Sequence, residues 1–380
     1  MRNKKLTIFI IAGEVSGDVL GARIMREMPD VRFVGVGGEN MIAAGLHSLF
    51  PMSDLSVMGV AEVVAHARTL TRRINQTVGA ILDVQPDIIL TIDSPGFARS
   101  VIKKIRKSSA GRALVANGLR FHHVVAPQVW AWRAGRAKKY AQTFDKLYAF
   151  FDFEVPYFTK YGLDTIAVGH PIADGLVGRN ASKHGGEKLI TLVPGSRMSE
   201  VKRLMPLFRD VAHKLVASGY DYKFAIPTVE TTAEFVRDSI REWDVRPELV
   251  SADKRYDLYS RTYIAVVTSG TVSAELAMLH IPTAVVYKMN PITTWLVRQV
   301  IRIKWVSLVN ILLNRCVYPE FLGRDARTEN VLGAVRQMAL PAVRETMIAE
   351  LKSADELWLR PDGVPAKLIA ESLMDSVRSK

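Results

Sequence analysis

The chain has 380 residues, of which 48% are hydrophobic, 23% are charged and one is a cysteine. This length suggests two domains, the apolar share excludes a mainly disordered protein, and one cysteine excludes an internal disulfide and a zinc site built of cysteines. The formal net charge of +13 favours an anionic partner, and it does not by itself choose among nucleic acid, an acidic membrane and a phosphorylated substrate.

The first predicted element is a buried strand. Basic residues followed by the apolar run 6–11 imitate a signal peptide, but this run is short, and Glu14 and Asp18 follow it without a small-residue cleavage pattern. No run approaches the roughly 20 apolar residues that a membrane-spanning helix needs. We therefore expect a soluble or peripheral protein of the cytoplasm.

Short apolar runs, each closed by Gly, Pro, Ser or Asp, alternate with helical patterns along the chain. Such runs are typical of parallel strands that are covered on both faces. They are Leu6–Ala12, Val31–Val36, Ile88–Ile92, Phe121–Val125, Lys146–Phe150, Thr165–Val168, Leu189–Val193, Tyr222–Ile226, Tyr263–Thr268 and Thr283–Tyr287. Two such series predict an α/β fold with two doubly wound, Rossmann-like domains.

The break between the two series falls near 169–171, just before a polar stretch. We expect an N-terminal domain over residues 1–170 and a C-terminal domain over 171–345. The helical pattern of 346–380 is expected to pack back on the N-terminal domain or on a partner subunit.

Ligands of open α/β sheets bind beyond the carboxyl ends of the strands, so the residues after each run are the candidates for a site. After the first run, Gly13, Gly17 and Gly21 suit a tight turn into a helix, and their spacing is not that of a dinucleotide fingerprint. Glu14 and Ser16 either belong to this turn or hydrogen-bond the hydroxyls of a sugar.

Asp93 follows the run 88–92 and precedes Ser94 and Pro95. It suits two roles: a cap of the next helix or a general base over a substrate hydroxyl. Its place at a strand end favours the base. His122 remains a second candidate, because we expect it at a strand end near Trp130, although a lone histidine is more often structural.

The second series opens with a loop that suits an anion. Gly195, Ser196 and Arg197 stand between a predicted strand and helix, where free N–H groups and a guanidinium favour phosphate. The alternative is a surface Arg197 paired with Glu200.

Ser269, Gly270 and Thr271 repeat this device after a later strand. Glu275 lies one turn further on, where it either receives the two hydroxyls of a ribose or balances the helix dipole. Two such loops in one domain suggest one nucleotide diphosphate. The chain has no G-x-x-x-x-G-K-[ST], which excludes a P-loop NTPase.

Two stretches combine apolar and basic residues: 57–64 with the arginines that follow it, and 291–313. This combination suits a membrane interface, a core helix or a dimer contact. No cluster has metal-ligand spacing, so we expect no metal, and no recognition motif supports nucleic acid. The side chains that we assign to acyl or membrane contact are Val57, Met58, Val60, Trp130 and Trp132.

These segments, in their order, resemble those of lipid-A-disaccharide synthase, a family of bacterial glycosyltransferases. Each motif is weak alone, but the ordered set covers nearly the whole chain. The matching stretches are 12–22, 57–63, 127–133, 169–174, 192–197 with Glu200, 269–271 with Glu275, 307–310 and 319–322.

The resemblance implies two Rossmann-like domains facing a cleft, the GT-B type. It implies that the N-terminal domain, 1–170, faces the acceptor and the membrane, and that the C-terminal domain, 171–345, binds the UDP-sugar. It implies an inverting, metal-free transfer without a cofactor, from UDP-2,3-diacylglucosamine to 2,3-diacylglucosamine 1-phosphate, on the inner face of the cytoplasmic membrane. It places functional residues at Asp93 and Arg197, and polar donor contacts at Asn310 and Glu320. The usual Asp-x-Pro-Asp-Phe-Asn is changed here, since Gly96 and Ala98 replace the second acid and the amide.

Two rival functions share the expected fold. A UDP-N-acetylglucosamine 2-epimerase would also bind a UDP-sugar, but it would have no need of lipid-compatible stretches. A sugar-nucleotide-binding protein without turnover would have no need of Asp93. A homodimer is a further possibility, and strongly salt-dependent binding to DNA would revive the nucleic-acid reading.

Overall fold

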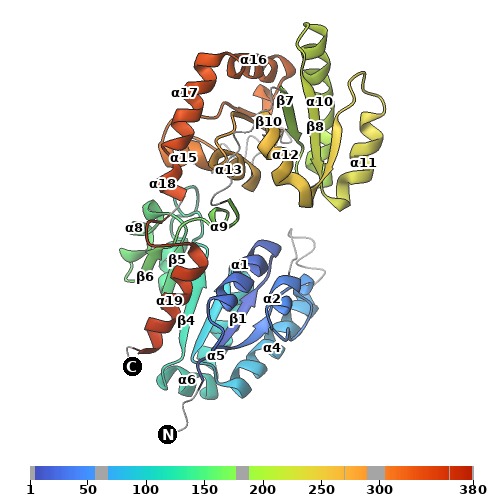
Figure 1. Cartoon of the computed structure of the whole chain (residues 1–380). Helices are drawn as coiled ribbons and strands as arrows, with labels where there is room; N and C mark the ends of the chain where they lie inside the picture. The colour runs from blue at the N-terminus through green and yellow to red at the C-terminus, as the bar shows by residue number, and fades with distance from the viewer. Residues whose placement is uncertain are drawn as a thin grey trace. The chain divides into compact units, whose positions relative to one another are not determined.

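The computed structural model describes residues 5–55, 67–176, 188–268, 270–288, 304–358 and 360–378. They form two compact units, one made of Met1–Pro171 and Leu359–Lys380 and the other of Ile172–Trp358 (Figure 1). The structure thus divides the predicted segment 346–380. Its first part belongs to the second unit and its last part to the first, because the residues before 359 continue the helices of the second unit.

The first unit is built on a six-stranded parallel sheet in the order β2-β1-β3-β4-β5-β6. Its strands are β1 (Thr7–Ala12), β2 (Arg32–Val36), β3 (Ile88–Ile92), β4 (Arg120–Val124), β5 (Lys146–Ala149) and β6 (Asp164–Ala167). Its helices are α1 (Val15–Arg26), α2 (Glu39–Ala43), α4 (Ala67–Val84), α5 (Pro95–Lys107), α6 (Ser109–Ala116), α7 (Arg136–Ala141), α8 (Pro156–Thr159) and α19 (Pro365–Arg378).

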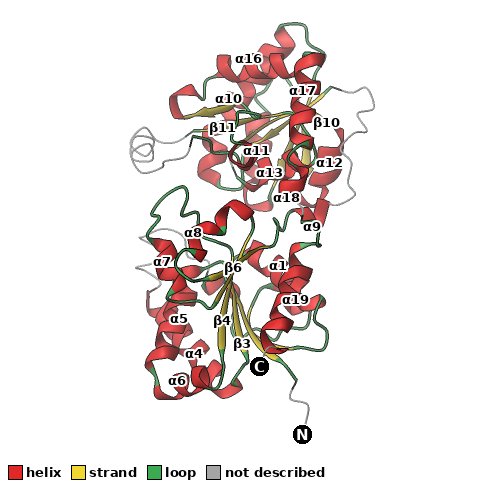
Figure 2. Cartoon of the chain, turned by 90° about the vertical axis from the view of Figure 1, so that its left-hand side faces the viewer, coloured by secondary structure: helices red, strands yellow, loops and turns green. Residues whose placement is uncertain are grey.

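Successive residues of these strands feed two separate cores. Phe9 and Ile11 pack into a cluster with the apolar side of α5, whereas Ile8 and Ile10 pack into a second cluster with α1 and α19. Figure 2 shows α4, α5 and α6 on one face of the sheet and α1 and α19 on the other. A strand that is buried on both faces must be apolar throughout, which explains the uninterrupted runs of the sequence.

The second unit repeats this plan with a six-stranded parallel sheet in the order β12-β11-β10-β7-β8-β9. Its strands are β7 (Leu189–Val193), β8 (Lys223–Thr228), β9 (Glu248–Ser251), β10 (Thr262–Thr268), β11 (Thr283–Tyr287) and β12 (Glu320–Leu322). Its helices are α9 (Ala173–Leu176), α10 (Met198–Ala217), α11 (Glu230–Ile240), α12 (Arg255–Arg261), α13 (Thr271–Met278), α15 (Leu308–Leu313), α16 (Thr328–Met338), α17 (Pro341–Lys352) and α18 (Asp355–Trp358).

The predicted class of two doubly wound parallel sheets is confirmed. The strands that the runs did not reveal, β9 and β12, are the two edge strands of the second sheet. An edge strand is covered on fewer sides, so its sequence lacks the continuous apolar run, as the partly exposed side chains of both strands show.

Candidate active site

The first group of predicted residues lies at the carboxyl edge of the first sheet. The neighbouring strands β1 and β3 place Ala12 opposite Ile92, so the loops that follow them, with Glu14 and Asp93, leave the sheet at the same edge. The strand order reverses between β1 and β3, and such a switch point is where open α/β sheets bind ligands. Glu14 is the N-cap residue of α1, and Ser16 is exposed. The structure therefore brings Asp93, Glu14 and Ser16 to one edge.

The backbone at Asp93 and Ser94 is left-handed, with φ angles of 55° and 46°. Such a conformation costs about 1 kcal/mol for each residue that is not glycine. The N–H of Ser94 donates to Oδ1 of Asp93 at 2.8 Å, and the Ser94 side chain lies where a Cβ on Gly13 would be. Because Ser94 is the N-cap residue of α5, Asp93 does not have the capping role that was its alternative.

The next strand carries a further strained residue. Val125 follows β4 with a φ of 85°, a value that is rare for a β-branched residue. Its chain neighbour Val124, the last residue of β4, accepts a hydrogen bond from the N–H of Asp93 at 3.1 Å. Strained backbone conformations are frequent at functional sites, because they persist only where the surrounding structure holds them in place.

His122 does not lie at this edge. It is the middle residue of β4, opposite Leu90, and only 2% exposed. Its Nδ1 lies 3.0 Å from the hydroxyl of Tyr148. Burial, assisted by Lys146 and Arg120, lowers the pKa of His122 to about 3, so the imidazole is neutral. The prediction that His122 stands at a strand end is wrong, and we do not include it among the catalytic candidates.

The loop after β4 holds Trp130 against a buried carboxylate that the sequence reasoning missed. Trp130 Nε1 donates to Oε1 of Glu154 at 3.2 Å. The backbone N–H groups of Phe150 and Phe151 donate to Oε2 of the same carboxylate. Burial raises the pKa of Glu154 to about 7, although these three hydrogen bonds oppose the shift. Glu154 follows the apolar run of β5, so the strand-end rule that found Asp93 was able to find it.

Trp132 is exposed, unlike Trp130. It is 37% exposed, and the guanidinium groups of Arg133 and Arg136 lie 4.8 and 4.5 Å from its ring centroid. Cations are attracted to the face of an indole, and an apolar ring flanked by cations suits a membrane interface. The other side chains that we assigned to acyl contact, Val57, Met58 and Val60, lie outside the described residues.

The second group of predicted residues surrounds a pocket of about 360 Å³ in the second unit. The strand order of this sheet reverses between β7 and β10, so the loops after these strands meet at its switch point. The predicted residues that line the pocket are Gly195, Ser196, Arg197, Glu200, Gly270, Thr271 and Glu275. Ser269 lies outside the described residues.

Two helices begin at this pocket, α10 after Arg197 and α13 after Gly270. Neither N-cap residue provides a side-chain hydrogen bond to its helix, so N–H groups of both first turns are available to an anion. Gly195 has a φ of 102°, and a Cβ on it would lie 2.6 Å from Oε2 of Glu200. This turn therefore requires glycine.

Arg197 is paired with Glu200, with Nη1 and Oε1 2.9 Å apart. This is the surface pair that was the alternative to a phosphate contact, and the side chains are 62% and 14% exposed. Such an exposed pair contributes little to stability. A guanidinium has five donors, so Arg197 keeps the capacity to bind an anion at the pocket.

Glu275 lies at the inner wall of the pocket beside residues that the sequence reasoning missed. The hydroxyl of Tyr256 donates to Oε1 of Glu275 at 3.1 Å, and Nη2 of Arg255 lies 3.6 Å from the same oxygen. Burial raises the pKa of Glu275, while Arg255 and Tyr256 oppose that shift. Nearby, Oγ1 of Thr268 is buried and has no hydrogen-bond partner among the described residues. The pocket thus joins a carboxylate and a free hydroxyl to the anion loops.

Asn310 and Glu320 are not among the residues that line this pocket. Asn310 is fully buried, and its Nδ2 donates to the carbonyl of Tyr318 and to Oε1 of Glu320 at 2.7 and 2.9 Å. Glu320 also accepts hydrogen bonds from the N–H and the hydroxyl of Ser307. The two residues link α15 to the start of β12 through the hydrogen bond between their side chains.

Among the described residues, no group of three or more His, Cys, Asp or Glu side chains is arranged to hold a metal ion. Within the same part of the chain, no helix is long and apolar enough to cross a membrane.

Comparison with known proteins decides the family. The family described as lipid-A-disaccharide synthetase matches residues 8–352. The chain belongs to the lipid-A-disaccharide synthase family, whose members are glycosyltransferases. It is 37% identical to a synthase of Rhodospirillum centenum, over 99% of this chain and 96% of that protein. It is 38% identical to a synthase of Gluconobacter oxydans, over 97% of this chain and 90% of that protein.

Solved structures show the same fold at low sequence identity. A putative UDP-N-acetylglucosamine 2-epimerase from Listeria monocytogenes matches with a TM-score of 0.63 and 13% identity, over 99% of this chain and 97% of that one. A UDP-glucosyltransferase from Polygonum tinctorium matches with a TM-score of 0.61 and 10% identity, over 99% of this chain and 99% of that one. Because the fold is common to epimerases and glycosyltransferases, it does not decide between them. The family does, and the epimerase alternative is not favoured.

Proposed function

We propose that the chain joins UDP-2,3-diacylglucosamine to 2,3-diacylglucosamine 1-phosphate and releases UDP and the β-1,6-linked disaccharide 1-phosphate. The observation that carries this proposal is the family match over residues 8–352. The placement of Asp93 at one switch point and of the anion loops at the other supports it.

Asp93 is the proposed general base. The 6-hydroxyl of the acceptor gives its proton to the Asp93 carboxylate while the oxygen attacks the anomeric carbon, and the bond from that carbon to the diphosphate breaks. Proton removal by a positioned carboxylate contributes roughly 10²–10⁴-fold to such a rate. The left-handed backbone of Asp93 and Ser94 supports this role, because it holds the carboxylate at the edge instead of letting it cap α5. Glu14 and Ser16 are proposed to bind sugar hydroxyls at the same edge.

The pocket of the second unit is proposed to bind the UDP part of the donor. Negative charge develops on the leaving diphosphate, and fixed N–H donors stabilise it without reorganisation. The first turns of α10 and α13 supply such donors, and Arg197 adds a guanidinium. Glu275, which Tyr256 and Arg255 hold in place, is suited to accept hydrogen bonds from ribose hydroxyls. Asn310 and Glu320 are proposed to support this domain through their mutual contacts.

A peripheral site of action on the inner face of the cytoplasmic membrane is part of the proposal, because both substrates carry acyl chains. Trp132 between two arginines supports it. Trp130 is proposed instead to position its loop through Glu154. The homodimer remains a prediction, which light scattering of the purified protein tests.

The test is to incubate the purified protein with both lipid substrates in detergent and to follow UDP release and disaccharide mass together. Joint appearance of the two products, lost in Asp93→Ala, supports the proposal. UDP without disaccharide shows a correct donor and a wrong acceptor. Conversion of UDP-N-acetylglucosamine to its 2-epimer would replace the proposal with the epimerase reaction.

A further inference from the structure

The positive charge of this protein is concentrated in one part of the first unit. From residue 94 to residue 144 the chain contains eleven lysines and arginines and neither aspartate nor glutamate. The whole chain has an excess of only +13. This segment begins directly after Asp93 and contains α5, α6, β4 and α7. Such an excess of cations in one segment contributes a positive potential to the surface around it, and that potential attracts anions.

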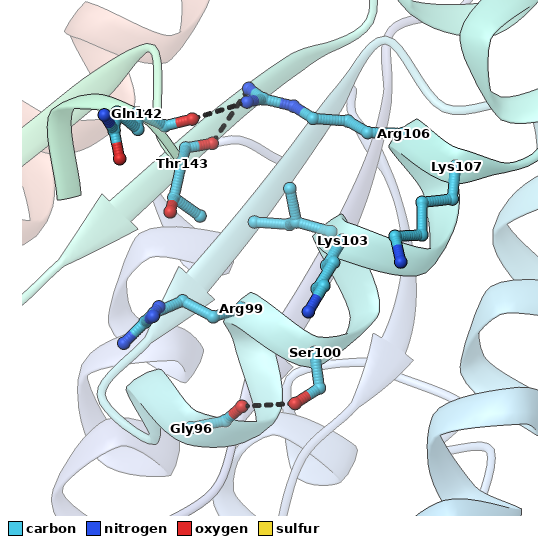
Figure 3. A pocket seen from close by; sticks show the side chains of 9 residues that line it. Gly96, Arg99, Ser100, Lys103, Arg106, Lys107, Gln142 and Thr143 are labelled. Carbon is cyan, nitrogen blue, oxygen red and sulfur yellow. Dashed lines mark hydrogen bonds between the residues drawn. The ribbon is translucent and has the colours of Figure 1, made fainter. Parts of the chain in front are cut away.

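A pocket of about 540 Å³ lies in this segment, along α5. Figure 3 shows that the side chains of Arg99, Lys103 and Lys107 leave successive turns of the helix beside it. Residues four apart lie on the same face of a helix, where like charges destabilise each other. Within the described part of the chain none of these three side chains forms an ion pair that would offset the repulsion. An anionic ligand in the pocket would offset it.

The far wall of the pocket is fixed. Arg106 donates from Nη1 and Nη2 to the carbonyl oxygens of Gln142 and Thr143 at 2.6 and 2.9 Å (Figure 3). Its guanidinium also lies over the ring of Phe121, 4.9 Å from the ring centroid. These partners are neutral, so the guanidinium keeps its charge while its position is set. The pocket therefore has a rigid cationic wall at Arg106, while the side chains of Arg99 and Lys103 are exposed to solvent.

The end of the pocket at Gly96 adjoins the loop of the proposed base Asp93. Gly96, which lines it, is three residues after Asp93, and Arg99 lies about 6 Å of helical rise beyond Pro95. The charges of Arg99 and Asp93 both affect the pKa of the Tyr140 hydroxyl. Burial raises this pKa most, Asp93 raises it further, and the cations of Arg136 and Arg99 lower it. Phosphate bound by Arg99 would thus lie close to a sugar whose hydroxyl reaches Asp93.

We propose that the part of this pocket near the start of α5, with Arg99, Ser100 and Lys103, binds the phosphate monoester of the acceptor lipid. The inference rests on the proposed function and adds to it the group that selects the acceptor. The 1-phosphate lies across one sugar ring from the 6-hydroxyl that attacks, which fits a cationic pocket directly beyond the Asp93 loop. An anionic lipid headgroup of the membrane carries the same phosphate chemistry, and the experiment separates the two.

The chain offers a matched pair of variants. Lys103 lines the pocket, whereas its neighbour Lys104 leaves the same helix on another side and bonds to Asn75. Lys103→Gln and Lys104→Gln remove the same charge from adjacent exposed positions of one helix. Each is assayed in detergent micelles with two acceptors, 2,3-diacylglucosamine 1-phosphate and the corresponding 1-O-methyl glycoside, which lacks the phosphate.

We expect Lys103→Gln to raise the KM for the phosphorylated acceptor about tenfold, with kcat and the KM for the donor unchanged. The methyl glycoside should show no difference between Lys103→Gln and the unchanged protein, and Lys104→Gln should match the unchanged protein on both acceptors. Equal losses on both acceptors, or equal losses in both variants, would overturn the phosphate site in favour of a diffuse attraction to the micelle surface. Flotation with phosphatidylglycerol vesicles then measures that attraction directly.

A binding titration separates this inference from the proposed reaction. Water-soluble glucosamine 1-phosphate is titrated into the full chain and into Lys103→Gln. Glucosamine, which lacks the phosphate at the anomeric carbon, is the control. Weaker binding of the phosphate compound alone in the variant supports the pocket even if no disaccharide is ever formed. Equal binding in both proteins would overturn the pocket even if the transferase reaction is found.

Discussion

The two sheets end their central strands in different ways. At the edge of the first sheet the left-handed backbone positions belong to Asp93, Ser94 and Val125, whereas the turns after β7 and β10 of the second sheet use Gly195 and Gly270. Glycine enters this region without strain, and other residues pay about 1 kcal/mol. The glycine turns leave backbone N–H groups open to a ligand, which suits phosphate. The strained turn keeps side chains at the edge, which suits proton transfer.

The largest expected effect concerns Asp93 itself. Asp93→Asn keeps the size of the side chain but removes its ability to accept a proton, so we expect kcat to fall about 10³-fold. The affinity for UDP should not change, because the proposed donor pocket lies in the other unit. Steady-state kinetics and calorimetric titration with UDP check the two statements. A rate within tenfold of the unchanged protein, or a parallel loss of UDP affinity, would contradict the assignment of proton transfer to the first edge and of UDP binding to the second.

The buried carboxylate of the first edge predicts a pH effect on stability. The pKa of Glu154 in the folded protein, about 7, lies above its ordinary value of 4.5. The folded state therefore binds this proton more tightly, so its contribution to stability is present below pH 4.5 and is lost as the pH rises to 7. Between pH 5 and pH 8 this loss amounts to about 2 kcal/mol.

Glu154→Gln should lack that loss. Its unfolding free energy relative to the unchanged protein should rise by about 2 kcal/mol from pH 5 to pH 8 in urea titrations. The amide also weakens the hydrogen bond from Trp130, but this constant offset does not alter the slope. Parallel pH curves for the two proteins would show that Glu154 does not titrate in this range.

Much of this arrangement follows from the sequence, because buried parallel strands need continuous apolar runs and the residue after each run reaches the ligand edge. Asp93 and the loop of Gly195 were found in this way. Arg255 and Tyr256 were not, because they belong to α12 and approach Glu275 only through the packing of that helix. His122 was wrongly expected at the end of a strand. It lies in the middle of β4, and a sequence pattern does not show that a polar residue inside an apolar run is buried.

The glycine turn of the second edge can be tested by adding one methyl group. Gly195→Ala forces an alanine to a φ of 102° and toward the Glu200 carboxylate, so we expect a loss of about 2 kcal/mol in stability and weaker UDP binding. Gly333→Ala is the matched control, since a Cβ there meets nothing within 4 Å and its helix gains about 0.5 kcal/mol. Unchanged UDP affinity in Gly195→Ala would mean that the turn does not shape the donor pocket.

The smallest effect tests whether the strain of the first edge has a function. Ser94→Gly relieves the left-handed backbone, so the unfolding free energy should rise by up to about 1 kcal/mol. The carboxylate of Asp93 should at the same time lose its fixed position, which should lower kcat about tenfold. Asn314→Gly is the control, because Asn314 has a similar φ of 49° at the end of α15 and is not among the residues that line the pocket of the second unit. It should gain stability without losing rate. If Ser94→Gly behaves like Asn314→Gly, the strain at Ser94 is incidental to the turn, and the contrast between a strained catalytic edge and a relaxed phosphate-binding edge fails.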